Sequence, residues 1–445
     1  MMNNVYFWTL GCSKNDVDTA QMQSLLDNEK FVVSDDIDKA DIIVVNTCGF
    51  IDSAKEESIN SILEASLYKE KGSCSALIVS GCLAQRYPDE LMKEIPEIDY
   101  IVGVGSIANI NKSLEDALEG HKSVDIEDIN SDYIEGLKKE NVNMTEYVKI
   151  SEGCNNNCSY CIIPKLRGRN RSRKIEDIYD EISYLVSKGT REVILIAQNT
   201  TDYGIDLYGE YKLAELIREI SRIDKLKWIR VLYLYPDHLN DELINEFKNN
   251  DKLLNYVDIP LQHINDSVLK AMNRKTNKED IQNIITKLRN EVEGIIIRTT
   301  FIVGFPGETD EAFKELYDFI KYNHIDKLGV FKYSREEDTR AYDLENQVSE
   351  DLKEERFSEI MSLQREISLV NNQKYIGKKY EVLIEEKLDN NEYAARSYMD
   401  TPDIDGLIYL HSEQELEINS FVKAEIVDSM EYDLIGEIIW ILQIN

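Results

Sequence analysis

Short apolar runs alternate with longer segments of mixed character along the first part of the chain. Runs of this length, rich in Val and Ile, predict buried strands, and the amphipathic segments between them predict helices. The expected strands cover residues 5–10, 41–46 and 76–80, and the expected helices cover residues 19–28 and 53–68. Because strands alternate with helices, the pattern predicts an α/β domain with a helix-covered parallel sheet over residues 1–124.

A second alternating series follows an acidic, weakly patterned segment at residues 125–143, which we interpret as a linker. Its expected strands cover residues 147–150, 192–197, 228–234, 256–260, 295–303 and 328–333. The first helix of this series carries Ile175, Ile178, Ile182 and Leu185 on one face and Gly189 where a C-terminal cap belongs. Six such units predict a partial (βα)6 barrel within residues 144–373.

The pattern changes again after a long charged helix expected at residues 349–373. The strands expected beyond it are separated by turn residues and cover 380–385, 406–410, 421–427 and 434–442. Several short strands joined by turns predict a small β-barrel. Residues 374–445 are therefore expected to form a third domain, of a kind that grips a polymer.

The chain carries 51 Lys and Arg residues against 84 Asp and Glu residues, a formal net charge of −33. A field of this sign repels phosphate backbones and attracts basic partners. Neither a secretory leader nor a run long enough to cross a bilayer is found, so we expect a cytoplasmic protein with no membrane partner. The cytosol keeps thiols reduced, so the seven cysteines are candidates for metal ligation or catalysis.

Three of these cysteines form a CxxxCxxC run, Cys154, Cys158 and Cys161, directly after the first strand of the second series. Three thiolates can hold three irons of a 4Fe-4S cubane and leave the fourth iron open for another ligand. A structural zinc site is the alternative, but zinc sites usually present paired CxxC or Cys/His sets, and no histidine lies nearby in the sequence. The spacing favours an iron–sulfur cluster with one open iron.

Cys12, Cys48 and Cys82 each follow one of the three strands expected in the first domain. The carboxyl ends of parallel strands lie at one edge of a sheet, so these thiols are expected to converge. A free cysteine is often only a small buried hydrophobic residue, but three at equivalent positions favour a second metal site. Cys74 precedes its strand and is expected at the opposite edge, where it takes no part.

The CxxxCxxC run resembles that of the radical SAM superfamily, in which S-adenosylmethionine (SAM) occupies the open iron. Together with the three domains, six segments resemble the methylthiotransferase family of radical SAM enzymes, whose last domain is a TRAM-like β-barrel. These segments are Thr9-Leu-Gly-Cys-Ser-Lys-Asn15, Asn46-Thr-Cys-Gly-Phe50, Gly81-Cys-Leu-Ala-Gln-Arg-Tyr87, Glu152-Gly-Cys154, Pro260-Leu-Gln-His263 and Gly304-Phe-Pro-Gly-Glu-Thr309. Nearly the whole chain is covered by this likeness.

The resemblance implies two 4Fe-4S clusters and SAM as cofactors. Cys12, Cys48, Cys82, Cys154, Cys158 and Cys161 would be the metal ligands, and Tyr160, Gln198 and Gly304 would bind the cofactor, Tyr160 through the adenine of SAM. Gln198 and His263 would face the barrel mouth, where each would bind SAM or substrate or, equally, have a structural role. No catalytic residue is assigned beyond the clusters. SAM would serve twice, once as methyl donor to sulfur at the second cluster and once as the source of a 5'-deoxyadenosyl radical.

Within the family, the likeness is greatest to the enzymes that methylthiolate the β-carbon of an aspartate in small-subunit ribosomal protein S-twelve. The segment that carries it, beside the Leu-Gly-Cys-Ser-Lys-Asn sequence, is Ala395-Arg-Ser-Tyr-Met-Asp-Thr-Pro-Asp-Ile-Asp-Gly406. Two positions depart from the family: Ser13 replaces a usual proline, and Glu337-Asp-Thr-Arg-Ala341 replaces Gly-Thr-Pro-Ala. Neither departure touches a predicted ligand.

The densest basic run follows the CxxxCxxC cysteines, and two interpretations of it stay open. Its charges either bind carboxylates of SAM and of a substrate aspartate or pair with acidic neighbours in the protein. The run consists of Lys165, Arg167, Arg169, Arg171, Arg173 and Lys174.

The predicted function is therefore methylthiolation of a basic ribosomal protein, with a sulfur donor and an electron donor such as flavodoxin or ferredoxin as further partners. The alternatives are a tRNA (adenosine) methylthiotransferase and a non-catalytic iron–sulfur electron carrier or redox sensor. Residues 375–445 carry five Lys and Arg against sixteen Asp and Glu, a net charge of −11. Proteins that grip RNA neutralise phosphates with Lys and Arg, so this charge disfavours a nucleic-acid substrate.

Overall fold

The computed structural model describes residues 2–72, 74–131, 133–389 and 391–439. The chain forms two compact units. The first contains Met1–Ile229 together with Ser334–Asp343, and the second contains Arg230–Tyr333 together with Leu344–Asn445. The segment Ser334–Asp343 thus belongs to the first unit, although it lies late in the sequence.

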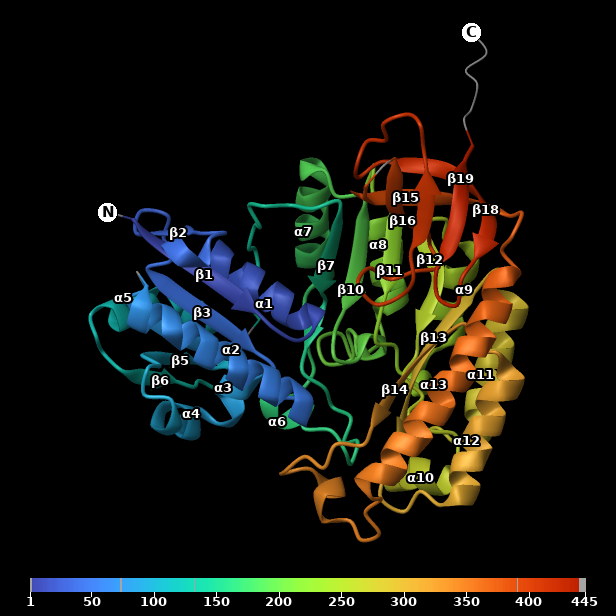
Figure 1. Ribbon diagram of the computed structural model, residues 1–445, viewed down its shortest axis with the longest axis horizontal. Coiled ribbons are helices and arrows are strands. Elements are labelled where there is room, and N and C mark those ends of the chain that lie inside the picture. The colour runs from blue at the N-terminus through green and yellow to red at the C-terminus, as the bar shows by residue number, and fades with distance from the viewer. Residues whose placement is uncertain (1, 73, 132, 390, 440–445) are drawn as a thin grey trace. The chain divides into compact units, whose positions relative to one another are not determined.

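A six-stranded parallel sheet forms the N-terminal part of the first unit (Figure 1). Its strand order is β2-β1-β3-β4-β5-β6. The strands are β1 (Asn3–Thr9), β2 (Phe31–Val33), β3 (Ile42–Thr47), β4 (Ala76–Gly81), β5 (Tyr100–Val102) and β6 (Ser123–Asp125). The three strands expected here are confirmed as β1, β3 and β4, which are neighbours in the sheet and end at a common edge.

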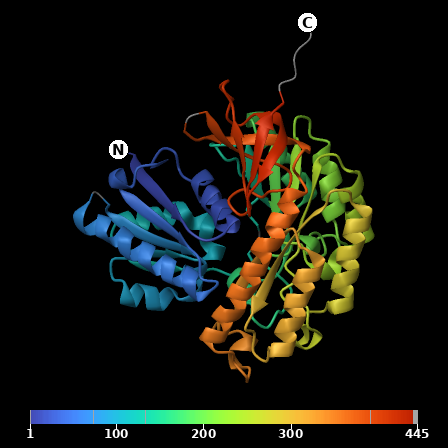
Figure 2. The same cartoon turned by 45° about the vertical axis from the view of Figure 1, so that its right-hand side comes forward.

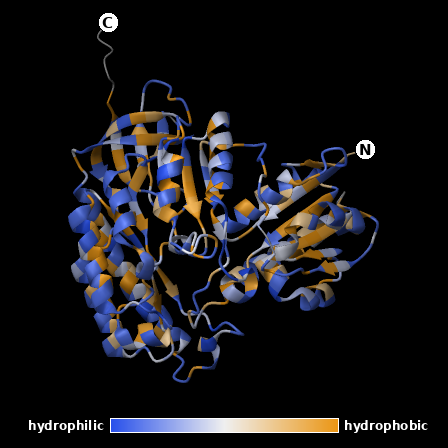
Figure 3. Ribbon diagram, turned by 180° about the vertical axis from the view of Figure 1, so that it is seen from behind, coloured by the Kyte–Doolittle hydropathy of each residue, from blue (hydrophilic) through white to orange (hydrophobic). Residues whose placement is uncertain are grey.

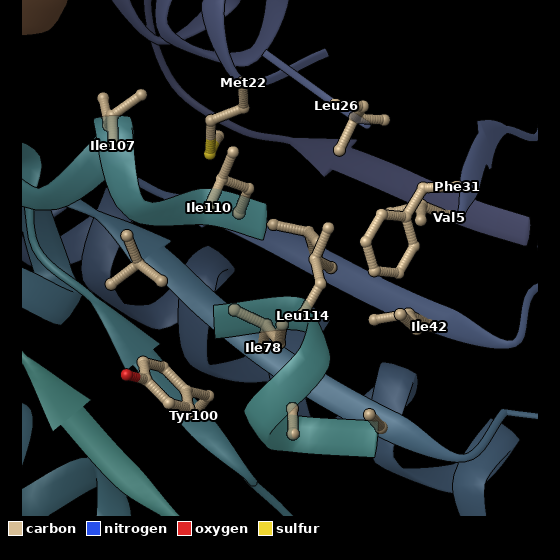
Figure 4. Packing of buried hydrophobic residues seen from close by; sticks show 14 residues of the cluster. Val5, Met22, Leu26, Phe31, Ile42, Ile78, Tyr100, Ile107, Ile110 and Leu114 are labelled. Atoms are coloured by element: carbon tan, nitrogen blue, oxygen red, sulfur yellow. The ribbon is translucent and has the colours of Figure 1, made fainter. Parts of the chain in front are cut away.

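Helices cover both faces of this sheet. They are α1 (Ser13–Ser24), α2 (Asp52–Lys71), α3 (Cys82–Arg86), α4 (Pro88–Glu94) and α5 (Ile110–Leu118). Met22 of α1 and Ile110 and Leu114 of α5 pack on the face that carries Ile42 of β3 (Figure 4). The next residue, Ile43, points to the opposite face and packs in the cluster that contains residues of α2 and α3. This alternation produces two separate apolar cores, as strand geometry requires.

Helix α1 begins at Ser13 and ends at Ser24, whereas the apolar pattern predicted residues 19–28, so that boundary was wrong. The early part of the helix is polar, and Lys14, Asn15 and Asp18 are buried there. A hydrophobic pattern does not detect a helical turn that buries polar side chains. The expected helix at residues 53–68 is confirmed as α2.

The first unit also contains the beginning of the second strand and helix series. Strands β7 (Thr145–Lys149) and β10 (Glu192–Ile196) pair in parallel, with Ile194 opposite Tyr147. Between them lie, in chain order, β8 (Ser151–Glu152), α6 (Ile163–Arg167), β9 (Arg171–Ser172) and α7 (Ile175–Lys188). Helix α8 (Leu213–Ser221) follows β10. Helix α7 buries Ile178, Ile182 and Leu185 and is capped by Gly189, as the sequence predicted.

The remaining strands of this series are β11 (Trp228–Val231), β12 (Leu253–Asp258), β13 (Ile296–Val303) and β14 (Lys327–Lys332). The pairs β12/β13 and β13/β14 are parallel. All six predicted strands are therefore present, with β7 and β10 paired in the first unit and β12, β13 and β14 paired in the second. Helices α9 (Asp241–Asn249), α10 (Asp266–Ala271), α11 (Lys278–Glu291) and α12 (Asp310–Asn323) alternate with the strands of the second unit.

The second unit ends with a long helix and a small barrel, shown in orange and red in Figure 2. Helix α13 (Glu350–Gln373) begins after Ser349, whose hydroxyl accepts a hydrogen bond from Leu352 N. The closed barrel has the order β15-β16-β17-β19-β18. Its strands are β15 (Lys379–Lys387), β16 (Glu392–Arg396), β17 (Ile408–His411), β18 (Phe421–Ser429) and β19 (Leu434–Ile438).

Strand β16 was not predicted, and residues 440–442 of the last expected strand lie outside the described residues. Apolar residues, orange in Figure 3, line the strands, whereas the helices show mixed surfaces. In the described part of the chain, none of the helices combines the length and apolar character needed to span a bilayer.

Candidate functional site

Cys12, Cys48 and Cys82 lie at the carboxyl ends of three neighbouring parallel strands, as the sequence predicted. Cys12 follows β1 and precedes α1, Cys48 follows β3, and Cys82 is the first residue of α3. Burial, followed by the neighbouring thiols of Cys82 and Cys12, raises the pKa of Cys48 to about 11. The thiols are therefore close enough to interact, and a metal would have to displace their protons on binding.

The backbone before Cys12 is shaped by a glycine. Gly11 has a φ of +93°, a value that side chains other than glycine rarely adopt. A β-carbon at this position would stand 2.7 Å from Cβ and 3.2 Å from Sγ of Cys48. Glycine thus permits the loop after β1 to approach the loop after β3.

Asn15, in the first turn of α1, connects these loops. Its side-chain amide donates hydrogen bonds to Leu10 O at 2.7 Å and to Thr47 O at 3.1 Å. Asn46 donates in turn to Asn15 O at 2.9 Å. The buried amide therefore fixes the chain just before Cys12 and just before Cys48.

The second group of thiols, Cys154, Cys158 and Cys161, lies in the loop between β8 and α6. Cys154 N donates to Gly168 O at 3.0 Å, and Cys161 N donates to Cys158 O at 3.1 Å. Asn156 N lies 3.4 Å from Cys154 Sγ and points its hydrogen at the sulfur. Burial raises the pKa of Cys154 to about 11. The three side chains are half-buried and belong to one tight loop.

Within the described ranges, no three His, Cys, Asp or Glu side chains are placed to hold a single metal ion. A cubane makes a different demand, because each thiolate binds a different iron and the sulfurs stand farther apart. Both cysteine groups supply three thiols, and each has an N–H donor aimed at a sulfur, Asn156 N at Cys154 and Arg167 Nε at Cys82. Such N–H groups are typical around cluster sulfurs, so the residues fit iron–sulfur clusters.

A buried ionic network in the first unit contacts Cys82 and includes Glu152 and Arg167, which lie before and after the CxxxCxxC cysteines in the chain. The Lys149 ammonium contacts Asp18 and lies 2.6 Å from the Glu152 carboxylate. Arg167 donates to Asp18 at 2.7 Å and to Cys82 Sγ at 3.3 Å. Although burial alone would raise the pKa of Glu152, the charges of Lys149 and Arg167 hold it at about 2. Two basic side chains, Lys149 and Arg167, thus face two acidic ones, Asp18 and Glu152, in this buried network.

Most members of the basic run after Cys161 pair with acidic neighbours, in agreement with one of the two interpretations. Arg173 contacts Asp177 and lies 2.6 Å from Glu181. Lys174 lies 3.0 Å from Glu135, and Lys165 lies 3.4 Å from Asp338. Arg171 donates to the carbonyl groups of Arg167 and Arg169. Arg169 itself is exposed.

One functional feature was missed from the sequence: the segment Ser334–Asp343 packs beside the cysteine loops of the first unit. The buried Glu336 carboxylate lies 2.9 Å from Lys55 Nζ and 2.7 Å from Arg86 Nη1. Ala341 N donates to Ser159 O, in the CxxxCxxC loop, at 2.8 Å. Nothing in its local pattern predicts these contacts, because every partner is distant in the sequence.

Comparison with known proteins agrees with this geometry. The descriptions that match are "Radical SAM superfamily" over residues 148–320, "Uncharacterized protein family UPF0004" over residues 4–103 and "TRAM domain" over residues 376–439. The ribosomal protein uS12 methylthiotransferase RimO of Clostridioides difficile (strain 630) is 49% identical over 97% of this chain and 98% of its own. The RimO protein of Desulforamulus reducens is 49% identical over 98% of this chain and 100% of its own. The chain belongs to the RimO family.

It is accordingly an enzyme, a methylthiotransferase with a radical SAM domain. Among solved structures, the chain resembles the radical SAM methyltransferase TsrM from Kitasatospora setae, with a TM-score of 0.55 and 13% identity. That likeness covers 75% of this chain and 72% of TsrM. At this identity it supports the fold alone.

The remaining residues predicted to bind SAM lie in different parts of this RimO family member. Tyr160 is half-buried between Cys158 and Cys161. Gln198 donates to Glu152 at 2.6 Å and so belongs to the ionic network. Gly304 lies in the second unit, with a φ of +73°, and its N–H donates to Glu308 at 2.9 Å. A cofactor-binding role for the three stays a prediction.

His263 has a structural environment in the second unit. Its ring is fully buried, and Nδ1 accepts a hydrogen bond from Asn265 N at 2.9 Å. Nε2 lies 3.5 Å from the Glu308 carboxylate. These contacts explain the histidine through packing within its own unit.

Proposed function

We propose that the chain adds a methylthio group to the β-carbon of an aspartate in ribosomal protein uS12, with SAM and two 4Fe-4S clusters as cofactors. The observation that carries the proposal is the gathering of six cysteines into two groups of three within one compact unit. Membership of the RimO family supports the uS12 substrate, since the curated relatives bear that name. We place the activity in the cytoplasm.

The two groups would divide the work. Cys154, Cys158 and Cys161 would hold the cluster that binds SAM, and Cys12, Cys48 and Cys82 would hold the cluster that presents sulfur. A radical SAM cluster, when bound and reduced, supplies the electron that cleaves SAM to the 5'-deoxyadenosyl radical. The protein's own part is to position and shield the thiols. Ile162 and Leu166 pack around Cys82 and exclude water from it.

The C-terminal barrel favours a basic protein over RNA. Three of its basic side chains are near carboxylates: Lys379 near Glu425, Lys387 near Glu415, and the buried Arg396 beside Glu385. Few cations therefore remain for phosphates, whereas Glu413, Glu415 and Glu417 are exposed. Such a surface attracts a substrate rich in Lys and Arg, and salt should weaken the attraction.

To test the substrate, the reduced enzyme, SAM and a sulfide source are incubated with uS12 in one reaction and with tRNA in another. We expect a methylthio mass increase on an aspartate of uS12 and none on tRNA. Modification of tRNA alone would overturn the proposed substrate. Repeating the uS12 reaction at increasing salt should raise KM, because the steering is electrostatic.

The division of labour is tested with a variant in which Cys12, Cys48 and Cys82 are alanine. This variant should still release 5'-deoxyadenosine from SAM and should form no methylthio product. If the variant keeps the cluster of Cys154, Cys158 and Cys161 but releases no 5'-deoxyadenosine, the assignment of SAM cleavage to that cluster is wrong.

We further propose a flavodoxin or ferredoxin as electron donor, a separate sulfur donor, and the domain boundaries at residues 124, 143 and 373.

A further inference from the structure

The charged side chain of Arg167 donates a hydrogen bond to one of the six cysteine sulfurs. It ends helix α6, six residues after Cys161, and its side chain is 2% exposed. Its Nε donates to Cys82 Sγ at 3.3 Å, and Cys82 begins a helix of the N-terminal sheet domain. A residue next to one cysteine group therefore contacts a ligand of the other.

The guanidinium is held in one orientation by other acceptors. Nη1 donates to Asp18 at 2.7 Å and lies 3.3 Å from Glu152. Nη2 donates to Asn15 Oδ1 at 2.7 Å. With these partners on both terminal nitrogens, the planar fork directs Nε toward the sulfur.

Through Asn15, the same guanidinium is connected to the backbone before Cys12 and before Cys48. The Asn15 amide donates to Leu10 O and Thr47 O, which precede Cys12 and Cys48. Arg167 accordingly fixes the side chain of Cys82 directly and the backbone before Cys12 and Cys48 through one intermediate.

We propose that Arg167 is a positioning residue for the cluster of Cys12, Cys48 and Cys82 and raises the reduction potential of that cluster. The inference rests on the proposed function, because it requires a cluster at these cysteines. An N–H donor beside a ligating sulfur stabilises the reduced, more negative cluster, and hydrogen bonds to sulfur are one of the means by which proteins set this potential. The contact also makes the geometry of this site depend on α6, which directly follows the SAM-binding cysteines.

A purely structural role is the competing explanation, since Arg167 also neutralises Asp18. Arg173 offers a matched control, because it too is a buried arginine paired with two carboxylates, Asp177 and Glu181, and no sulfur contact is described for it. Arg169, exposed in the same segment, controls for surface charge. Arg167 differs from Arg173 in its contacts with Cys82 Sγ and Asn15, the two contacts that lead to the cysteines.

The experiment uses the full chain with Cys154, Cys158 and Cys161 changed to alanine, so that a single cluster remains. Its midpoint potential is measured by a redox titration followed by electron paramagnetic resonance, and iron content and thermal unfolding are recorded. Arg167→Gln should make the potential more negative, with an approximately tenfold change in the one-electron equilibrium, or roughly 59 mV. Arg173→Gln and Arg169→Gln should leave the potential and spectrum unchanged.

Loss of this cluster in Arg167→Gln, with no more thermal destabilisation than in Arg173→Gln, would equally support the positioning role. If Arg167→Gln does not fold, Arg167→Lys decides: one ammonium does not reproduce the fork, so its potential should still shift. An unchanged potential and spectrum in the folded Gln or Lys variant overturns the proposal. If the chain that lacks Cys154, Cys158 and Cys161 but keeps Arg167 binds no iron, the proposed cluster at Cys12, Cys48 and Cys82 is wrong. That result is distinct from an unchanged potential, which would contradict only the role of Arg167.

Discussion

Arg86 Nη1 lies 2.7 Å from the carboxylate of Glu336, and both side chains are buried. The two residues are 250 positions apart in the sequence. Glu336 also receives a hydrogen bond from Lys55 at 2.9 Å, and Arg86 Nη2 donates to Glu337 O at 3.0 Å. One carboxylate thus neutralises two cations, Lys55 of α2 and Arg86 of α3, the helix that begins with Cys82.

Glu336→Gln should destabilise the first unit strongly. The substitution removes the negative charge and leaves Arg86 buried without its counter-ion, a change that costs about 3–5 kcal/mol for buried pairs. Thermal and urea unfolding of the full chain would measure the loss. Glu337→Gln is the control, because Glu337 is exposed and should change stability by less than about 0.5 kcal/mol. Equal effects of the two substitutions would contradict the role of the buried carboxylate.

Cys74→Ala should leave the iron content of the reconstituted enzyme unchanged. Cys74 precedes β4, whereas Cys82 follows it, and the strand separates them by roughly 20 Å at about 3.3 Å per residue. The Cys74 thiol instead donates to Ala76 O at 3.2 Å within an apolar core. Cys48→Ala, by contrast, should lower the iron from about eight atoms to about half, as expected for two cubanes each held by three thiolates. Similar iron losses in the two variants would refute the ligand assignment.

The arrangement of the cysteines was predictable because it depends on short-range signals. Apolar runs located β1, β3 and β4, and a cysteine just after each strand was enough to place three thiols at one sheet edge. The helix expected at residues 349–373 is likewise observed as α13, Glu350–Gln373, and its capping hydroxyl, from Ser349, lies directly before it. In each case, the interaction that determines the structure lies close to the pattern that predicts it.

The buried ionic network was not predictable for the opposite reason. Asp18 is 131 residues from Lys149 and 149 residues from Arg167. Each of these side chains, seen alone, has the polarity of a surface residue, and only their mutual pairing permits burial. The same polarity hid the first turn of α1, so the basic run could not be assigned to its acidic partners from the sequence.

Gly304→Ala tests whether this glycine is required by packing rather than by cofactor contact. Its φ of +73° disfavours alanine, and the added β-carbon would overlap Cγ of Lys353 in α13. We expect a loss of more than about 1 kcal/mol in unfolding free energy, measured without SAM. Gly307→Ala is a useful control, because it shares a positive φ but its β-carbon would meet no atom within 4 Å. A Gly304 variant as stable as the Gly307 variant would argue against the packing explanation.

His411, in the C-terminal barrel, should titrate at a higher pH than an ordinary histidine. Its Nδ1 lies 2.8 Å from Glu392 and its Nε2 lies 3.2 Å from Glu413, and hydrogen bonds to these carboxylates raise its pKa above 6.5. Because the folded value exceeds the unfolded one, the stabilisation is complete below the unfolded pKa and is lost as pH rises through the folded pKa. The chain contains five histidines, so their ring C–H signals can be followed individually by NMR. Glu392→Gln should lower the His411 midpoint toward its ordinary value, whereas the exposed Glu417→Gln should not. A His411 midpoint at or below 6.5 in the unaltered protein would show that the two carboxylates do not hold the charged ring.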